Sequence, residues 1–253
     1  MRENLTKSKI NAGETAYGVF INVGCPSLVE IIGHIGFDFA LLDAEHSPMD
    51  LETCENMVRA ADSVNITPII RIALNAQQNI LRYMDAGALG VVIPMLNTKA
   101  DAEAVVKSVR YRPEGQRGLA GVRANNWGIT GPQSDYIKVA NEENLVITQI
   151  ETMEAVKNLD EILTIPGIDV VFIGPNDLSV AMGYPAQVNH PEVQKMIESL
   201  VTKIRAAGKA AGTVAYDFDT LKKCQERGFQ FITYNIVPML VKSGREYLQA
   251  ARQ

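Results

Sequence analysis

The sequence predicts a single (β/α)8 barrel over residues 1–253. Eight short runs of β-branched and aliphatic residues alternate with amphipathic helical patterns from one end of the chain to the other. Six of these units recur at intervals of about 25 residues. Apolar residues make up 47% of the chain but aromatic residues only 6%, which suits a parallel sheet covered by helices. Eight strands that are each followed by a helix form a closed barrel.

The predicted strands are continuous aliphatic runs, as expected of strands buried on both faces. They are Tyr17–Val23, Phe39–Asp43, Pro68–Ile72, Val91–Met95, Leu145–Ile150, Val170–Gly174, Ala210–Ala215 and Phe231–Ile236. The predicted helices include one that begins at Asp50, and Ala76–Ala86, Lys99–Arg110, Met153–Leu163, Pro191–Ala207, Thr220–Arg227 and Val237–Ala251. The connection Tyr111–Asn144, between the fourth and fifth strands, is longer than the others and contains five glycines and two prolines. Because long loops in compact domains are usually functional, we expect a lid or a subunit contact there.

Composition and charge exclude several classes of protein. A net charge of -5 and a pI near 5.3 argue against a nucleic-acid partner, which requires a basic face. No apolar stretch approaches the ~20 residues of a membrane span, and the polar N-terminus lacks the apolar core of a signal peptide. Three cysteines at unrelated spacings are typical of reduced thiols. We therefore expect a cytoplasmic protein without a membrane or nucleic-acid partner.

Chemically active side chains gather at the C-terminal ends of the predicted strands, where barrel enzymes have their active sites. They are Asp43, Glu45, His46, Arg71, Gln149, Glu151, Asn176 and Asp177. Glu151 and Asp177 are typical of a hard-metal site that leaves coordination positions open for a substrate. Mg²⁺, Mn²⁺ or Co²⁺ would then act as a Lewis acid on a chelating 2-oxoacid and stabilise its enolate. Alternatively, Glu151 only begins a helix, where acids are favoured.

Arg71 and His46 complete the predicted site. Arg71 follows the apolar run Pro-Ile-Ile, and its guanidinium could brace an enolate with fixed donors. The alternative is a purely structural pair between Arg71 and a barrel carboxylate. His46 lies just past a strand end and suits a proton carrier near neutral pH, or it is a loop histidine bonded to the backbone. Asp43 or Asp85 could orient its ring.

The sequence lacks the signatures of other catalytic mechanisms. No predicted strand ends in lysine, which a Schiff-base aldolase requires, and Lys209 precedes a strand at the wrong end of the barrel. The chain has no Gly-x-Gly-x-x-Gly, no P-loop and no Cys–His zinc spacing. A metal-assisted carbanion mechanism remains.

Taken together, these residues resemble the HpcH/HpaI aldolase family of class II pyruvate aldolases. The matching segments cover most of the chain and are Phe37–His46 (FDFALLDAEH), Asp85–Ala88 (DAGA), Val92–Met95 (VIPM), Arg112–Gly118 (RPEGQRG), Gln149–Thr152 (QIET) and Val171–Ser179 (VFIGPNDLS). The last two motifs are specific to this family. The resemblance implies a barrel whose last helix is exchanged with a partner subunit, in dimers that assemble into hexamers. It also implies a reversible cleavage of a 4-hydroxy-2-oxoacid into pyruvate and an aldehyde, as in the catabolism of aromatic compounds. 4-Hydroxy-2-oxoheptanedioate and 2-dehydro-3-deoxyglucarate are examples of such substrates.

The family's residue roles carry over by motif. The metal ligands would be Glu151 and Asp177, the transition-state stabiliser Arg71, the general base His46, and the contacts to the oxoacid Gln149, Asn176 and Asp177. Asp85 resembles the acid that raises the basicity of His46, with Asp43 as a further neighbour. The chain departs from the family at Asn176, where many relatives carry a small residue, and at the end of strand eight, Thr233-Tyr234-Asn235. The difference at Asn176 is expected to change how the oxoacid is held. The end of strand eight, together with the segment Gly121–Ser134, which also departs from the family pattern, is expected to shape the aldehyde pocket.

Two alternatives use the same enolate differently. They are decarboxylation of oxaloacetate, as in macrophomate synthase, and cleavage of a citramalyl-type thioester. A thioester substrate should require basic residues for coenzyme A, and the sequence has no obvious cluster of them. A barrel that only binds a ligand is the alternative from another class. It would be expected to lack a metal ligand or the base, yet the sequence has both.

Overall fold

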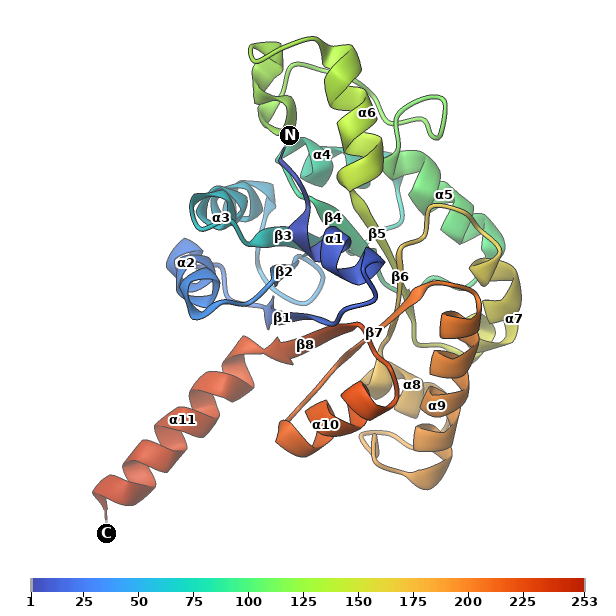
Figure 1. Cartoon of the computed structure of the whole chain (residues 1–253). Helices are drawn as coiled ribbons and strands as arrows, with labels where there is room; N and C mark the ends of the chain where they lie inside the picture. The colour runs from blue at the N-terminus through green and yellow to red at the C-terminus, as the bar shows by residue number, and fades with distance from the viewer. Residues whose placement is uncertain (1, 253) are drawn as a thin grey trace.

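Eight parallel strands close into a barrel in the order β1 to β8 in the computed structural model, which describes residues 2–252 (Figure 1). The strands are β1 Ala16–Ile21, β2 Phe39–Asp43, β3 Thr67–Arg71, β4 Gly90–Ile93, β5 Leu145–Ile150, β6 Val170–Ile173, β7 Ala210–Val214 and β8 Phe231–Asn235. Every predicted strand is present, and its ends are shifted by at most two residues. The predicted fold class is therefore confirmed.

Helices separate the strands and surround the barrel (Figure 1). They are α1 Leu5–Asn11, α2 Pro26–Ile35, α3 Leu51–Ser63, α4 Gln77–Asp85, α5 Lys99–Val109, the 3-10 segment η1 Arg123–Gly128, α6 Gln133–Glu143, α7 Met153–Leu163, α8 Pro175–Ala181, α9 Pro191–Ala206, α10 Phe218–Glu226 and α11 Ile236–Ala251. The sequence analysis did not predict α1, α6 and α8. Within residues 2–252, no helix has the length and apolar character needed to cross a membrane.

Alternate side chains of the strands fill the interior of the barrel. Phe39 and Leu41 of β2 belong to this inner cluster, together with Phe231 of β8. The rings of Phe39 and Phe231 stack with their centroids 4.0 Å apart. Ile10 of α1 joins the cluster, and because α1 directly precedes β1, it packs against the N-terminal end of the barrel. The packed interior leaves the C-terminal ends of the strands as the place for a ligand.

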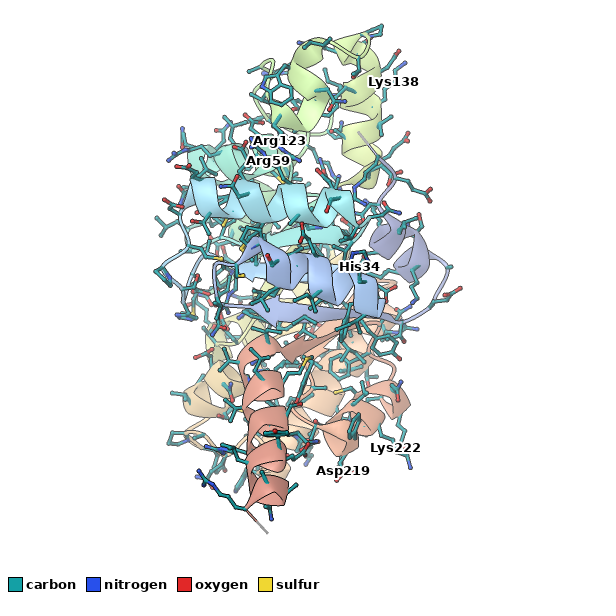
Figure 2. All side chains as sticks on the ribbon, turned by 90° about the vertical axis from the view of Figure 1, so that its left-hand side faces the viewer. His34, Arg59, Arg123, Lys138, Asp219 and Lys222 are labelled. Carbon is teal, nitrogen blue, oxygen red and sulfur yellow. The ribbon has the colours of Figure 1, made fainter. Side chains whose placement is uncertain are left out.

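The connection Tyr111–Asn144 contains η1 and α6 and is not the structureless loop that its glycines suggest. It runs from the end of α5 to the start of β5, which places both of its ends at the N-terminal end of the strands. Arg123 of η1 donates to the carbonyl of Ala86, over 3.0 Å, and pairs with Asp62 of α3. Figure 2 shows Arg123 beside α3, which carries the labelled Arg59. No residue of this connection lines the cavity at the strand C-termini. This position argues against a lid over the cavity of the same chain, and the expected subunit contact stays a prediction.

The last helix, α11, projects away from the barrel (Figures 1 and 2). Among its described side chains only Ile236 is buried. Leu240 is 55% exposed and Leu248 48% exposed, and Val237 and Val241 are also exposed. An apolar helix face without a partner in its own chain is consistent with the expected helix exchange.

Candidate active site

The alternation that fills the barrel also brings the predicted site residues to its mouth. On β2 the inward-facing Leu41 is followed two residues later by Asp43, and on β3 Ile69 is followed by Arg71. Gln149 follows the same rule on β5. A cavity of about 250 Å³ lies at this end of the barrel. The predicted residues that line it are Asp43, His46, Arg71, Gln149, Asn176 and Asp177.

Arg71 and Asp43 form a buried, bidentate ion pair. Nε and Nη2 of Arg71 donate to the two carboxylate oxygens of Asp43, each over 2.9 Å. Arg71 is 8% exposed and Asp43 only 2%. The face of the guanidinium lies 4.6 Å from the ring centroid of Phe20. The planar fork of arginine matches this geometry. Within residues 2–252 no protein group accepts a hydrogen bond from Nη1 of Arg71, so Nη1 is available to a substrate oxygen.

Glu45 is a site residue to which the sequence analysis gave no role. Its Oε2 lies 3.1 Å from Nε of Arg71 but makes no hydrogen bond, because that Nε–H already points at Asp43. Burial raises the pKa of the Glu45 carboxyl, and the charges of Asp43 and Asp177 raise it further. The opposing effects of Arg71 and His46 lower it only in part. The sequence analysis placed Glu45 at this strand end, and the structure adds its proximity to Arg71.

His46 lies at the rim of the cavity, and Asp43 positions its backbone. Oδ1 of Asp43 accepts hydrogen bonds from the backbone N–H groups of Glu45 (3.1 Å) and His46 (3.2 Å). The His46 side chain is 67% exposed, and its Nε2 lies 3.7 Å from Oε2 of Glu45. Asp43 therefore fixes the loop that carries His46 and does not contact its ring.

Asp85 does not join the site within this chain. It is the last residue of α4, which runs back from the mouth of the barrel to the N-terminal end of the strands. There its Oδ1 accepts a hydrogen bond from Nη2 of Arg117 over 2.8 Å. The expected contact between Asp85 and His46 is absent from the described part of the chain, because α4 separates the two residues along the barrel axis. His34 also lies apart, on the exposed side of α2 (Figure 2).

Glu151 is held from two sides at the end of β5. Its Oε1 accepts a hydrogen bond from the backbone N–H of Met95 (2.8 Å), and its Oε2 accepts one from Nε2 of Gln149 (2.5 Å). Burial raises the pKa of Glu151, these two hydrogen bonds lower it, and the nearby Asp177 and Glu45 raise it. The N-cap of α7 is Thr152. Glu151 therefore lies outside the helix, and the alternative that it merely begins one loses support.

The residues present fit a hard divalent metal. Within residues 2–252, Glu151 is 3% exposed and pairs with no lysine or arginine, and the acceptor oxygen of Gln149 beside it is buried without a donor. A Cβ at Gly174 would lie 2.7 Å from Oε2 of Glu151, so glycine is needed here to make room for the carboxylate. Within residues 2–252 no three His, Cys, Asp or Glu side chains converge as a closed ligand set. Glu151 and Asp177 would leave positions open for water and substrate.

The buried carboxylate of Glu151 should lower the stability of the metal-free protein at neutral pH. Because its native pKa is raised above the ordinary 4.5, the native state binds this proton more tightly than the unfolded state does. Stability is therefore lost as the pH rises above 4.5. We expect Glu151→Gln to raise the Tm in a chelator at pH 7.5 by roughly 2–4 °C, corresponding to about 1 kcal/mol in a chain of this size. At pH 4 the gain should vanish.

Thermal melts at both pH values, followed by circular dichroism, measure this effect. Glu198→Gln is the matched control, since Glu198 is exposed in the middle of α9 and should shift the Tm at neither pH. A lower Tm for Glu151→Gln at pH 7.5 would contradict the assignment of an uncompensated carboxylate.

Comparison with known proteins agrees with the fold. The family model HpcH/HpaI aldolase/citrate lyase matches residues 16–240. The chain is 38% identical over 239 residues to a 2-keto-3-deoxy-L-rhamnonate aldolase of Salmonella gallinarum, covering 94% of this chain and 88% of that protein. The crystal structure of an HpcH/HpaI aldolase/citrate lyase family protein of Burkholderia cenocepacia superposes with a TM-score of 0.93 at 30% identity, over 99% of this chain and 100% of the other.

A further solved structure, citrate synthase SbnG, superposes with a TM-score of 0.89 at 29% identity, over 98% of this chain and 97% of the other. Relatives of this fold thus include proteins described as aldolases and as a synthase. The family model spans nearly the whole barrel, from the start of β1 into α11. This chain belongs to the HpcH/HpaI aldolase/citrate lyase family.

Proposed function

We propose that this protein is a divalent-metal-dependent class II aldolase that reversibly cleaves a 4-hydroxy-2-oxoacid into pyruvate and an aldehyde. The observation that carries the proposal is the convergence of Arg71, His46, Asp177 and Gln149 on one cavity, with Glu151 behind it. Family membership and the aldolase relatives support the reaction class. We also place the protein in the cytoplasm, because its three cysteines are free, as is typical of reducing compartments.

Glu151 and Asp177 would hold the metal, which is Mg²⁺, Mn²⁺ or Co²⁺. When bound, the metal supplies a Lewis acid for the carbonyl and carboxylate of the 2-oxoacid. Gln149 and Asn176 line the same wall of the cavity, and we assign them contacts to the oxoacid. Since the side chain of Gln149 is buried and already fixed by Glu151, it can orient a substrate without a large loss of entropy.

Arg71 is assigned the stabilisation of the enolate. The bidentate bond to Asp43 fixes the plane of its guanidinium and leaves Nη1 to donate to the developing oxyanion. A donor that is already oriented does not have to reorganise as the charge develops. A structural ion pair, the alternative role considered for Arg71, does not exclude this function, because one guanidinium can be anchored by Asp43 and still contact the substrate.

His46 is assigned the role of the base. In cleavage, it takes the proton of the C4 hydroxyl, directly or through water, as C4 becomes the carbonyl of the aldehyde. The electron pair of the C3–C4 bond remains on the C3 side as the enolate of pyruvate, and a proton then returns to C3 to form the methyl group. The exposed ring of His46 can exchange its proton with solvent between turnovers.

Enolate formation can be measured without knowing the aldehyde. Metal-stripped protein in heavy water should exchange the methyl protons of pyruvate only after Mg²⁺, Mn²⁺ or Co²⁺ is added, as followed by NMR. Glu151→Gln and Asp177→Asn should reduce this exchange by about 100-fold or more, because each removes a charged ligand. Full exchange by either variant in a chelator would show that the metal assignment is wrong.

The base can be separated from the enolate site. His46→Ala should lower aldol cleavage by about 10²–10⁴-fold, the usual contribution of a positioned base. Oxaloacetate decarboxylation forms the same enolate without removal of a hydroxyl proton, so it should fall far less. Steady-state rates of the variant on both substrates test this difference. Equal losses would argue against His46 as the hydroxyl base and favour the oxaloacetate decarboxylase alternative.

We further propose that the active form is a homo-oligomer built from dimers, up to a hexamer. In this assembly Asp85 comes from a neighbouring copy. Asp85 cannot reach His46 in its own chain, since it lies at the opposite end of α4. The apolar face of α11 is exposed and can pack on a partner. Both features are explained if a second copy covers α11 and supplies Asp85 to the first.

Mixing two inactive variants tests this arrangement. After mild dissociation and reassociation, His46→Ala and Asp85→Asn together should recover up to about a quarter of the wild-type activity, because random mixing restores one intact site in four. Mixing His46→Ala with Glu151→Gln is the control and should recover nothing, since both residues belong to one cavity. A monomer by light scattering, or no recovery in the first mixture, would contradict the proposal.

A further inference from the structure

Two asparagines line the cavity on the wall formed by β8 and β1, and the proposed reaction gives them no role. Asn235 ends β8 and pairs in register with Phe20 of β1. Asn22 comes directly after the end of β1, two residues beyond Phe20, and both asparagines line the cavity. Within residues 2–252, neither side chain makes a hydrogen bond to another protein group. Asn22 is exposed and Asn235 is half-buried, so each amide can donate to and accept from a ligand hydroxyl group in place of water.

This wall lies across the barrel from the oxoacid end of the site. In the closed order of strands, β1 is opposite β5, which carries Gln149 and leads to Glu151. His46, the proposed base at C4, follows β2, the neighbour of β1. A substrate held by its oxoacid group at β5 and β6, with C4 near His46, would extend the remainder of its chain toward Asn22 and Asn235.

The charges around the cavity disfavour a second carboxylate on the substrate. Arg71 is the only lysine or arginine that lines the cavity in the described part of the chain. Its charge is already taken up by Asp43, and Glu45 lies beside it. Together with Glu151 and Asp177, four carboxylates lie in or beside the cavity, against one arginine. Even a bound divalent cation therefore leaves no excess positive charge for a distal anion.

We propose that Asn22 and Asn235 form a hydroxyl-reading subsite for the aldehyde half of the substrate. The subsite selects a neutral, hydroxylated aldehyde over one that ends in a carboxylate or in a plain alkyl chain. Neutral amides that both donate and accept match hydroxyl groups, and they offer no charge to a carboxylate. This inference rests on the proposed aldolase function, because it concerns the second substrate of that reaction.

The first experiment compares three aldehydes of similar size in the condensation with pyruvate, using the full-length, metal-loaded protein. They are glyceraldehyde, propanal and succinic semialdehyde. We expect kcat/KM for glyceraldehyde to exceed the other two values by about tenfold or more, since each net hydrogen bond contributes about 0.5–1.5 kcal/mol. A preference for succinic semialdehyde, or equal values for all three, would overturn the inference.

Substitutions then test whether the two amides cause the preference for glyceraldehyde. Asn22→Leu and Asn235→Leu keep the size of the side chain, and each should lower the ratio of kcat/KM for glyceraldehyde to that for propanal by about fivefold. Asn56→Leu, on the exposed surface of α3, is the matched control and should leave the ratio as in the wild type. Asn235→Lys should shift the preference toward succinic semialdehyde, because it adds the missing cation. Unchanged ratios in all three cavity variants would overturn the assignment.

Pyruvate exchange in heavy water separates this inference from the proposed function. Exchange without discrimination among the aldehydes would leave the aldolase proposal standing and remove only the hydroxyl-reading subsite. Absence of both exchange and condensation in the wild-type protein would remove the aldolase proposal, and the subsite with it.

Discussion

The buried pair of Arg71 and Asp43 is the interaction on which the rest of the site depends. One carboxylate anchors the guanidinium through two 2.9 Å hydrogen bonds and also fixes the backbone that leads to Glu45 and His46. Removing either partner would leave a buried charge uncompensated, which typically costs about 3–5 kcal/mol. The pair therefore couples the donor for the enolate on β3 to the position of the proposed base after β2.

The other half of the site, in contrast to this ion pair, has an unbalanced negative charge. In the described part of the chain Glu151 has two hydrogen-bond donors but no lysine or arginine partner, and its pKa is raised mainly by burial. A folded protein keeps such a carboxylate at a cost in stability, and that cost is reversed when a cation binds. The clearance at Gly174 and the donor from Met95, which adopts a left-handed backbone conformation with φ 52°, maintain this arrangement. Strained backbone of this kind is often found beside functional groups.

Two parts of the chain lie away from the cavity. The connection that contains η1 and α6 packs at the N-terminal end of the strands, together with Asp85 and Arg117, and α11 leaves the barrel with its apolar side chains exposed. Neither contributes to the cavity of its own chain. A site that borrows a group from a neighbouring copy would tie activity to assembly, which accounts for segments that a monomeric barrel does not need.

The sequence by itself determined the barrel, its eight strands and the strand-end residues Asp43, Arg71 and Gln149, because the period-two alternation of a buried strand decides which side chains face inward. The motif around Glu151 and Asp177 was also recognisable locally. Only the tertiary structure decided that Asp43 binds Arg71, that Asp85 lies away from His46 and that Asn22 and Asn235 line the same cavity. These relations depend on how strands and helices far apart in the chain are placed around the barrel axis, and no local pattern records that placement.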